Sequence, residues 1–243
     1  MTFKSFIFGL LASFGLPWLA VVVLPFSSMR ALDVESVEDG DNKKTFSMAR
    51  AGRVNEGSKV YGQEGCYYCH TQLIRPTYAG GDVHRDEWAG LRLTADNPDT
   101  RRETIPTDYE GEKVAHVGIG RVGPDLSNLG RRLEHYLKGQ DLSPEIWLYL
   151  HLYDPRTNSG YVENDQQIHR HSTCPSKVGL FEEVPAVQAG GEALPLDTPE
   201  DIAIIPTDRA RALVSYLASL KKDTLASPVP EAYNLNPTPT KED

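Results

Sequence analysis

Two cysteines and a histidine stand close together in the string Cys66-Tyr67-Tyr68-Cys69-His70. Two thiols at this spacing can each add to one vinyl group of a haem, and the adjacent histidine can then reach the iron. The C-x-x-C-H pattern is typical of c-type haem attachment. Attachment uses two of the three cysteines in the chain, which also accounts for their odd number. The sequence therefore predicts one covalent haem c on Cys66 and Cys69, with His70 as an iron ligand.

Two other kinds of site also use a C-x-x-C pair. A redox-active pair is one, but the βαβ surroundings expected for it are missing from the sequence. A structural zinc site is the other, because His171 and Cys174 in the stretch IHRHSTCPSK could complete a set of three thiolates and one imidazole. A haem domain fits the neighbouring helical patterns better, and the zinc module stays as an alternative.

The composition of the 243-residue chain excludes one class of partner and supports a packed core. The formal net charge of -9 argues against nucleic acid, because phosphate binding requires a basic face. Hydrophobic residues make up 40% of the chain, which is enough for a core of ordinary size. Three cysteines are too few for a disulfide scaffold, so their role is expected to be chemical.

An uncharged stretch near the N-terminus predicts a membrane anchor over residues 1–30. Residues 5–29 carry no charged side chain and are long enough to cross a hydrocarbon layer of about 30 Å as a helix. The apolar run exceeds the h-region of a signal peptide, and no small-x-small cleavage site follows it. Because haem c is attached outside the cytoplasm, we expect a single pass through the inner membrane, with a cytoplasmic N-terminus and a periplasmic haem domain.

Composition divides the remainder of the chain into segments. Residues 31–48 are acidic and polar and suit a stalk, whereas residues 49–226 are expected to hold the mono-haem domain. The segment 78–120 combines many charged residues with Gly and Pro, which predicts a long surface excursion. Residues 183–206, rich in Pro and Gly, are predicted to be a loop. The Pro-rich end, residues 227–243, is predicted to be a flexible tail.

Three helices are predicted after the anchor. The first lies within residues 49–65. Ser143 is a suitable N-cap for the second, because proline follows at the first helical position, and Thr207 caps the third. The inner stripes expected on the first and third helices consist of Gly57, Val60 and Tyr61, and of Ala210, Leu213, Val214, Leu217 and Leu220. Since no stretch alternates convincingly, the fold class is predicted to be mainly α, with long loops.

The second iron ligand cannot be a methionine on a later loop, which is the arrangement that gives a high-potential His/Met iron. The chain has three methionines, Met1, Met29 and Met48, and all of them precede the attachment site.

The order of the motifs resembles subunit II of cbb3-type cytochrome c oxidases, the membrane-anchored mono-haem cytochrome. The N-terminal apolar helix is followed by VYGQEGCYYCHTQLIRP, RVGPDLSNLGRR, HLYDPRTNS, STCPS and ALVSYLASL. The segments 78–120 and 183–206 have no counterpart in the pattern. The resemblance implies a class I cytochrome c domain with long loop insertions.

The resemblance also implies roles for particular residues. In such a domain the helix before the haem site packs against the terminal helix, which would bring together Gly57, Tyr61, Tyr216 and Leu217. The Pro124 carbonyl would accept a hydrogen bond from the His70 imidazole, and such a bond fixes the ring. Arg75 would contact a haem propionate or the catalytic subunit, and a merely solvated Arg75 is the alternative.

The departure from the family pattern lies at the axial methionine. The family carries it in a string like S-x-M-P, and here the string STCPS puts Cys174 in that place. Three outcomes follow from this substitution. Cys174 ligates as a thiolate and lowers the potential, or His171 or His169 takes over, or the iron stays five-coordinate and binds small gases.

The function implied by the resemblance is electron transfer. The subunit would relay electrons through its haem iron to the catalytic haem-copper oxidase subunit that reduces dioxygen, beside other cytochrome c subunits in the membrane. It would hold no catalytic residue itself. Two alternatives keep the haem: the cytochrome subunit of another respiratory complex, such as a nitric oxide reductase, and a membrane-tethered haem sensor.

Overall fold

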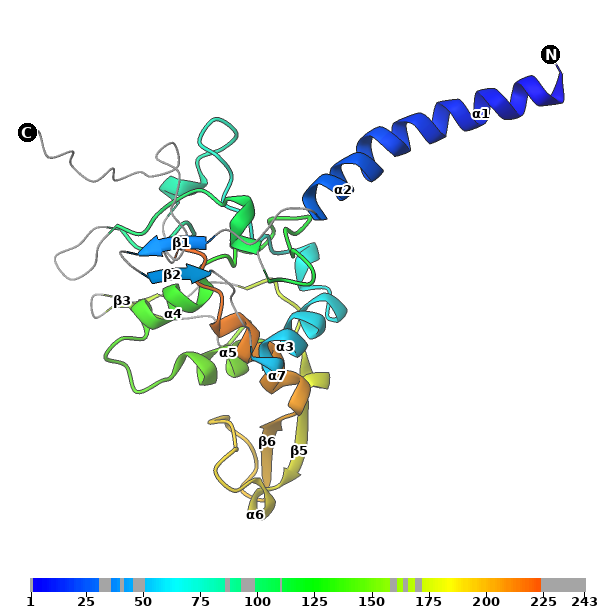
Figure 1. Cartoon of the computed structure of the whole chain (residues 1–243). Coiled ribbons are helices and arrows are strands. Elements are labelled where there is room, and N and C mark those ends of the chain that lie inside the picture. The colour runs from blue at the N-terminus through cyan, green and yellow to red at the C-terminus, as the bar shows by residue number, and fades with distance from the viewer. Residues whose placement is uncertain are drawn as a thin grey trace, which may run out of the picture. The chain divides into compact units, whose positions relative to one another are not determined.

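The computed structural model describes residues 2–30, 36–39, 42–45, 51–85, 88–92, 99–109, 111–157, 161–163, 166–168 and 172–223 (Figure 1). Contacts divide the chain into two compact units, Met1–Ser47 and Met48–Asp243, which are described separately below. The histidines His169 and His171, the predicted tail and most of the predicted stalk lie outside the described residues.

A long apolar helix dominates the described part of the first unit. It consists of α1 (Phe3–Trp18), a π-helical turn η1 (Leu19–Val23) and α2 (Leu24–Arg30). The π-helical turn lies between Pro17 and Pro25, which both lack the N–H that a regular helical turn uses. Residues Phe3–Ser28 have a mean hydropathy of 2.3 and are long and apolar enough to cross a membrane. A short antiparallel hairpin follows, formed by β1 (Ser36–Asp39) and β2 (Asn42–Thr45).

The centre of the second unit is the contact between α3 (Gly52–Gln63) and α7 (Asp208–Ala218), which lie side by side (Figure 1). A Cβ atom on Gly57 would lie 1.9 Å from the Ala212 carbonyl oxygen and 2.7 Å from the Cβ of Tyr216. Only glycine permits this approach. Tyr61 packs edge-on against Tyr216, with ring centroids 5.5 Å apart. The predicted contacts of Gly57 and Tyr61 with Tyr216 are therefore confirmed.

Two further helices, α4 (Leu129–Tyr136) and α5 (Pro144–Tyr153), complete the helical core. Ser143 caps α5 by accepting from the Ile146 N–H at 3.2 Å, and Thr207 caps α7 by accepting from the Ala210 N–H at 3.3 Å. Every residue predicted for the two inner stripes is buried. Both predicted helix starts and both stripes are thus confirmed, and helix is the commoner regular structure in the described residues.

The prediction of a loop over residues 183–206 is wrong at both ends of that segment. The strands β5 (Phe181–Pro185) and β6 (Ile202–Pro206) pair in an antiparallel register, and the short helix α6 (Ala186–Ala189) follows β5. Pro185 and Pro206 stand at the ends of their strands in a two-stranded sheet, where the missing N–H costs little. The proline content therefore does not exclude strands here. A shorter antiparallel pair joins β3 (Tyr161–Glu163) to β4 (Gln166–Ile168).

The segment 78–120 is more than a surface excursion, which corrects the prediction. It has little regular structure, with the 3-10 turns η3 (Asp82–His84) and η4 (Pro106–Tyr109). A small second core nevertheless forms from Ile74, Val83, Trp88 and Ala89, all of them buried. These apolar residues are few and irregularly spaced along the chain, so no periodicity in the sequence reveals them. The segment also buries the ion pair between Arg102 and Asp108.

Candidate functional site

The segment Cys66–His70 forms a tight turn directly after α3. Gly65 adopts the left-handed conformation (φ 71°) just after the helix, and the 3-10 turn η2 (Cys66–Tyr68) follows. The N–H groups of Cys69 and His70 both donate to the Cys66 carbonyl oxygen, at 3.2 and 3.0 Å. The two cysteine side chains are free thiols and, like the imidazole, are partly exposed. The turn therefore gathers all three predicted attachment residues into one accessible stretch.

The imidazole of His70 is held by a backbone acceptor from a distant part of the chain. Its Nδ1 lies 2.8 Å from the Pro124 carbonyl oxygen, which can only accept, so Nδ1 carries the proton. Nε2 is then the nitrogen whose lone pair can bind a metal. Burial lowers the pKa of His70, because it disfavours the charged imidazolium, and this keeps the ring in the neutral form that a metal ligand requires. The contact expected between His70 and Pro124 is present.

Gly123 lets the two segments meet at the imidazole. A Cβ atom at this position would lie 2.2 Å from Cε1 of His70 and 2.7 Å from its Nδ1. No side chain other than hydrogen fits there without moving the ring. Gly123 is a site residue that the sequence reasoning missed, although its place before Pro124 in the string RVGPD was visible.

The segment 117–126 runs along the turn and continues past it. Backbone hydrogen bonds join Ile119 to Tyr67, Val117 to Gln72, Gly123 to Cys69 and Leu126 to Thr71. The buried carboxylate of Asp125 accepts from the Thr71 hydroxyl at 2.6 Å and from the Leu73 N–H at 2.8 Å. These bonds fix the chain on both sides of His70, so the orientation of its ring is set by the fold.

Cys174 lies close to the same turn, although it follows it by more than a hundred residues in the sequence. Its N–H donates to the Ser172 hydroxyl at 3.2 Å. Burial raises the pKa of the Cys174 thiol, and the charge of Cys69 raises it further. Burial likewise raises the pKa of Cys66 to about 12, and the charge of Cys174 contributes in the same direction. Lys177, three residues after Cys174, donates to the Glu64 carbonyl oxygen at 2.8 Å, and this bond ties the Cys174 segment to the chain just before the turn.

The zinc alternative finds no support in the described part of the chain. No group of three or more His, Cys, Asp or Glu side chains is arranged there to hold a metal ion. The three cysteines are all described, and they do not form such a group. His171, the fourth ligand of that alternative, lies outside the described residues.

Arg75 is paired with a carboxylate, and its side chain is otherwise partly exposed to solvent. Its Nε and Nη2 donate to the two oxygens of Asp82, at 3.0 and 2.8 Å, and its backbone N–H donates to the same carboxylate at 3.0 Å. Arg121 pairs with Asp82 at 2.5 Å and also donates to the Leu73 carbonyl oxygen. Two guanidinium groups thus share one carboxylate, so these three side chains together carry a net positive charge.

Replacing Asp82 with asparagine is expected to lower the free energy of unfolding by about 3 kcal/mol at pH 7, because Arg75 and Arg121 lose their buried carboxylate. Burial alone would raise the pKa of Asp82, but the hydrogen bonds from these arginines outweigh it and hold the pKa near 2. Since this value lies below the ordinary 3.8, Asp82 stabilises the fold above about pH 4. That stabilisation is lost as the pH falls from about 4 to about 2.

Urea unfolding of both proteins across this range tests the prediction. The difference between wild type and Asp82→Asn should shrink by about 2 kcal/mol between pH 5 and pH 2. The exposed Asp141→Asn serves as the control and should show no such change. A difference that stays constant with pH would contradict the assigned charge state.

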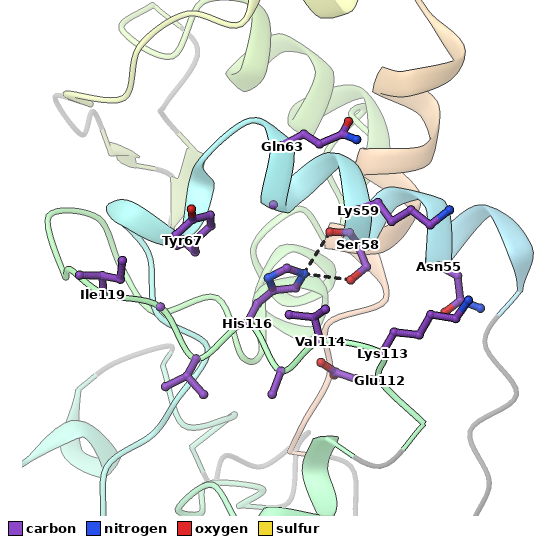
Figure 2. Close-up of a pocket in the computed structure, with 14 residues that line it drawn as sticks. Asn55, Ser58, Lys59, Gln63, Tyr67, Glu112, Lys113, Val114, His116 and Ile119 are labelled. Carbon is purple, nitrogen blue, oxygen red and sulfur yellow. Dashed lines mark hydrogen bonds between the residues drawn. The ribbon is translucent and has the colours of Figure 1, made fainter. Parts of the chain in front are cut away.

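A groove of about 660 Å³ lies beside the turn, between α3 and residues 112–119 (Figure 2). Tyr67 and Ile119 line one end of it, and His116 lies at its centre. Nε2 of His116 is 3.0 Å from both the hydroxyl and the carbonyl oxygen of Ser58. Because a carbonyl oxygen only accepts, Nε2 carries the proton and cannot take one from the hydroxyl. Ser58 and His116 are therefore not arranged as a nucleophile and its base.

The site as a whole offers one oriented imidazole, two thiols spaced along the same turn and a third thiol beside them. The neutral ring with a free Nε2 lone pair fits a haem iron, and the two free, partly exposed thiols fit covalent attachment of its vinyl groups. A scan against models of known protein families finds no match for the chain, and a search of curated proteins finds no similar protein.

Proposed function

We propose that the chain is the membrane-anchored mono-haem cytochrome c subunit of a cbb3-type terminal oxidase. The observation that carries the proposal is the orientation of His70, whose Nδ1 is bound by the Pro124 carbonyl oxygen while Nε2 is left for a metal, one residue after the C-x-x-C pair. This combination of a fixed, neutral imidazole and two free thiols suits a covalently attached haem c.

Each residue of the site has a distinct role in this proposal. Cys66 and Cys69 would hold the macrocycle through their sulfur atoms, and His70 would bind the iron. Pro124 and Gly123 orient the imidazole. The haem, when bound, supplies an iron that takes up and gives up one electron. The cationic group of Arg75 and Arg121 suits an anionic haem propionate, which is the role proposed for Arg75.

The distal ligand is proposed to be Cys174, with His171 or His169 as the alternative. Lys177 ties the Cys174 segment to the chain just before the turn, and the family resemblance puts the string STCPS where an axial methionine is expected. A thiolate stabilises ferric iron and lowers the reduction potential relative to a His/Met pair. The subunit would therefore work at a lower potential than its relatives with methionine.

The proposed partners are the catalytic haem-copper subunit and other cytochrome c subunits. Support comes from the order of the motifs in the sequence and from the apolar helix Phe3–Ser28, which is long enough to anchor the chain in a membrane. In this proposal the N-terminus is cytoplasmic and the haem domain periplasmic, on the inner membrane.

The first test is the presence of covalent haem in the full-length chain, produced in bacteria that attach haem c. Wild type should keep its haem after denaturing electrophoresis and show a c-type spectrum. The double variant Cys66→Ser and Cys69→Ser should lose at least nine tenths of the covalent haem. Cys174→Ser, the control with the third thiol removed, should keep it. A wild-type chain that binds zinc and no haem would contradict the proposal.

Identifying the subunits that copurify with the chain then shows which respiratory complex it belongs to. A multi-helix partner containing both haem and copper supports the oxidase, whereas a partner with haem and no copper supports the nitric oxide reductase type. Carbon monoxide binding by the reduced chain, without any partner subunit, would favour the haem sensor instead.

A further inference from the structure

Asp125 directly follows Pro124, and it is fully buried. One oxygen of its carboxylate accepts from the Thr71 hydroxyl at 2.6 Å and from the Leu73 N–H at 2.8 Å. The other oxygen accepts from the Ser127 N–H at 2.8 Å. All three partners donate, so both oxygens act only as acceptors. The carboxylate therefore joins two segments that are 54 residues apart in the sequence.

The peptide group between Pro124 and Asp125 carries the carbonyl oxygen that lies 2.8 Å from Nδ1 of His70. The direction of this carbonyl is restricted from both sides. The proline ring fixes φ on one side, and the hydrogen bonds of the Asp125 side chain hold the residue on the other. The buried Arg132 also donates to the Asp125 carbonyl oxygen, at 3.2 Å. These restraints fix the place at which the imidazole meets its acceptor.

The position requires a carboxylate, because an amide of the same shape cannot accept from all three donors. Asparagine has one acceptor oxygen and one donating NH2 group. In one orientation its NH2 group would face the Ser127 N–H, and in the other it would face the Thr71 hydroxyl and the Leu73 N–H. Since the position is buried, donors that face one another there lose their hydrogen bonds and push the two segments apart.

We propose that Asp125 is a positioning residue that holds the Pro124 carbonyl oxygen against Nδ1 of His70 and so leaves Nε2 for the haem iron. It acts on the imidazole through the peptide group that precedes it and through the chain that follows His70. The inference rests on the proposed function for the identity of the metal.

Exchange of the imidazole protons with water in the full-length, haem-free chain tests the inference. Nuclear magnetic resonance of the chain with isotope-labelled histidine reports the Nδ1 proton of His70. The same spectrum reports the Nε2 proton of His116, which is bound by the Ser58 carbonyl oxygen of α3 at 3.0 Å. Asp125→Asn should speed the exchange of the His70 proton at least tenfold and change that of His116 less than twofold. An equal rise at both histidines would show general destabilisation and overturn the inference.

Asp223→Asn is the matched control for the loss of a buried carboxylate. Asp223 is 1% exposed, and its carboxylate accepts from the Thr100 hydroxyl at 2.6 Å and from the Arg131 guanidinium at 3.3 Å. The variant should leave the exchange of the His70 proton within twofold of wild type. A tenfold rise here as well would show that any buried carboxylate of the unit has the same effect, and the role assigned to Asp125 would be wrong.

Thr71→Val gives a milder perturbation of the same contact, because it removes one of the three donors and keeps the carboxylate. It should speed the exchange of the His70 proton at least threefold. If Asp125→Asn does not fold, this variant decides the question, and unchanged exchange at His70 then overturns the inference.

The remaining outcomes distinguish this inference from the proposed function. A wild-type chain whose Nδ1 proton on His70 is unprotected overturns the inference. A protected proton in a wild-type chain that acquires no covalent haem overturns the proposed function alone. Covalent haem in wild type, together with unchanged exchange at His70 in Asp125→Asn, overturns the inference alone.

Discussion

Replacing Gly123 with alanine is expected to displace the His70 ring and to destabilise the second unit. The new Cβ atom would lie 2.2 Å from Cε1 of His70, so the imidazole or the backbone must move. Either movement breaks the 2.8 Å bond to the Pro124 carbonyl oxygen. Overpacking of this kind costs about 1–3 kcal/mol, and the lost hydrogen bond adds about 1 kcal/mol. We expect the free energy of unfolding to fall by roughly 3 kcal/mol and covalent haem to fall at least tenfold.

Gly179→Ala is the matched control for this substitution. An added Cβ at Gly179 meets no atom within 4 Å, so both the stability and the haem content should stay at wild-type levels. Urea unfolding of the haem-free chain measures the first quantity, and haem staining after denaturing electrophoresis measures the second. A Gly123→Ala protein with wild-type stability would show that the close approach of the two segments is not needed.

The Cys174→Met variant is expected to have a changed ferric spectrum and a higher reduction potential. Methionine restores a neutral thioether in place of an anionic thiolate, and the neutral ligand stabilises ferrous iron. Because axial ligands set haem potentials over a range of roughly 0.8 V, the rise should be a large fraction of a volt rather than a few millivolts. Redox titration of the full-length chain, followed by absorption spectroscopy, measures both effects.

The Cys174→Ser variant separates ligation from packing at this position. It keeps the size of the side chain and lacks the thiolate, so it should lose the wild-type ferric spectrum as Cys174→Met does. Spectra and potentials that are the same in all three proteins would rule out cysteine ligation. Ligation by His171 or His169, or a five-coordinate iron, would then be the remaining alternatives.

Local signals explain most of what could be predicted from the sequence. The cap residues Ser143 and Thr207 and the apolar stripe of α7 depend on neighbours within one helix, and the structure bears them out. The C-x-x-C-H string is equally local, because its spacing alone brings the side chains onto one turn. Gly57 was recognisable as a member of an inner stripe, although the closeness of its approach to Ala212 was not.

The remaining features depend on partners that are far apart in the sequence. Lys177 reaches Glu64, which is 113 residues earlier, and no pattern in either segment indicates the pairing. Asp82 is one of several acids in a highly charged segment, and nothing in the sequence distinguishes its role between Arg75 and Arg121 from that of a solvated carboxylate. The strands β5 and β6 were hidden by prolines whose positions at the strand ends become clear only from the pairing register.

The packing of Gly57 against Ala212 and Tyr216 has a consequence for the order of folding. Gly57 lies near the beginning of the second unit, whereas Ala212 and Tyr216 lie near the end of its described part. Such non-local contacts form late, and a ribosome that adds about 5–20 residues each second delivers α7 many seconds after α3. The cysteine-bearing turn follows α3 directly, so it is synthesised well before the helix that supports it. During that interval its thiols remain open to any enzyme that modifies them.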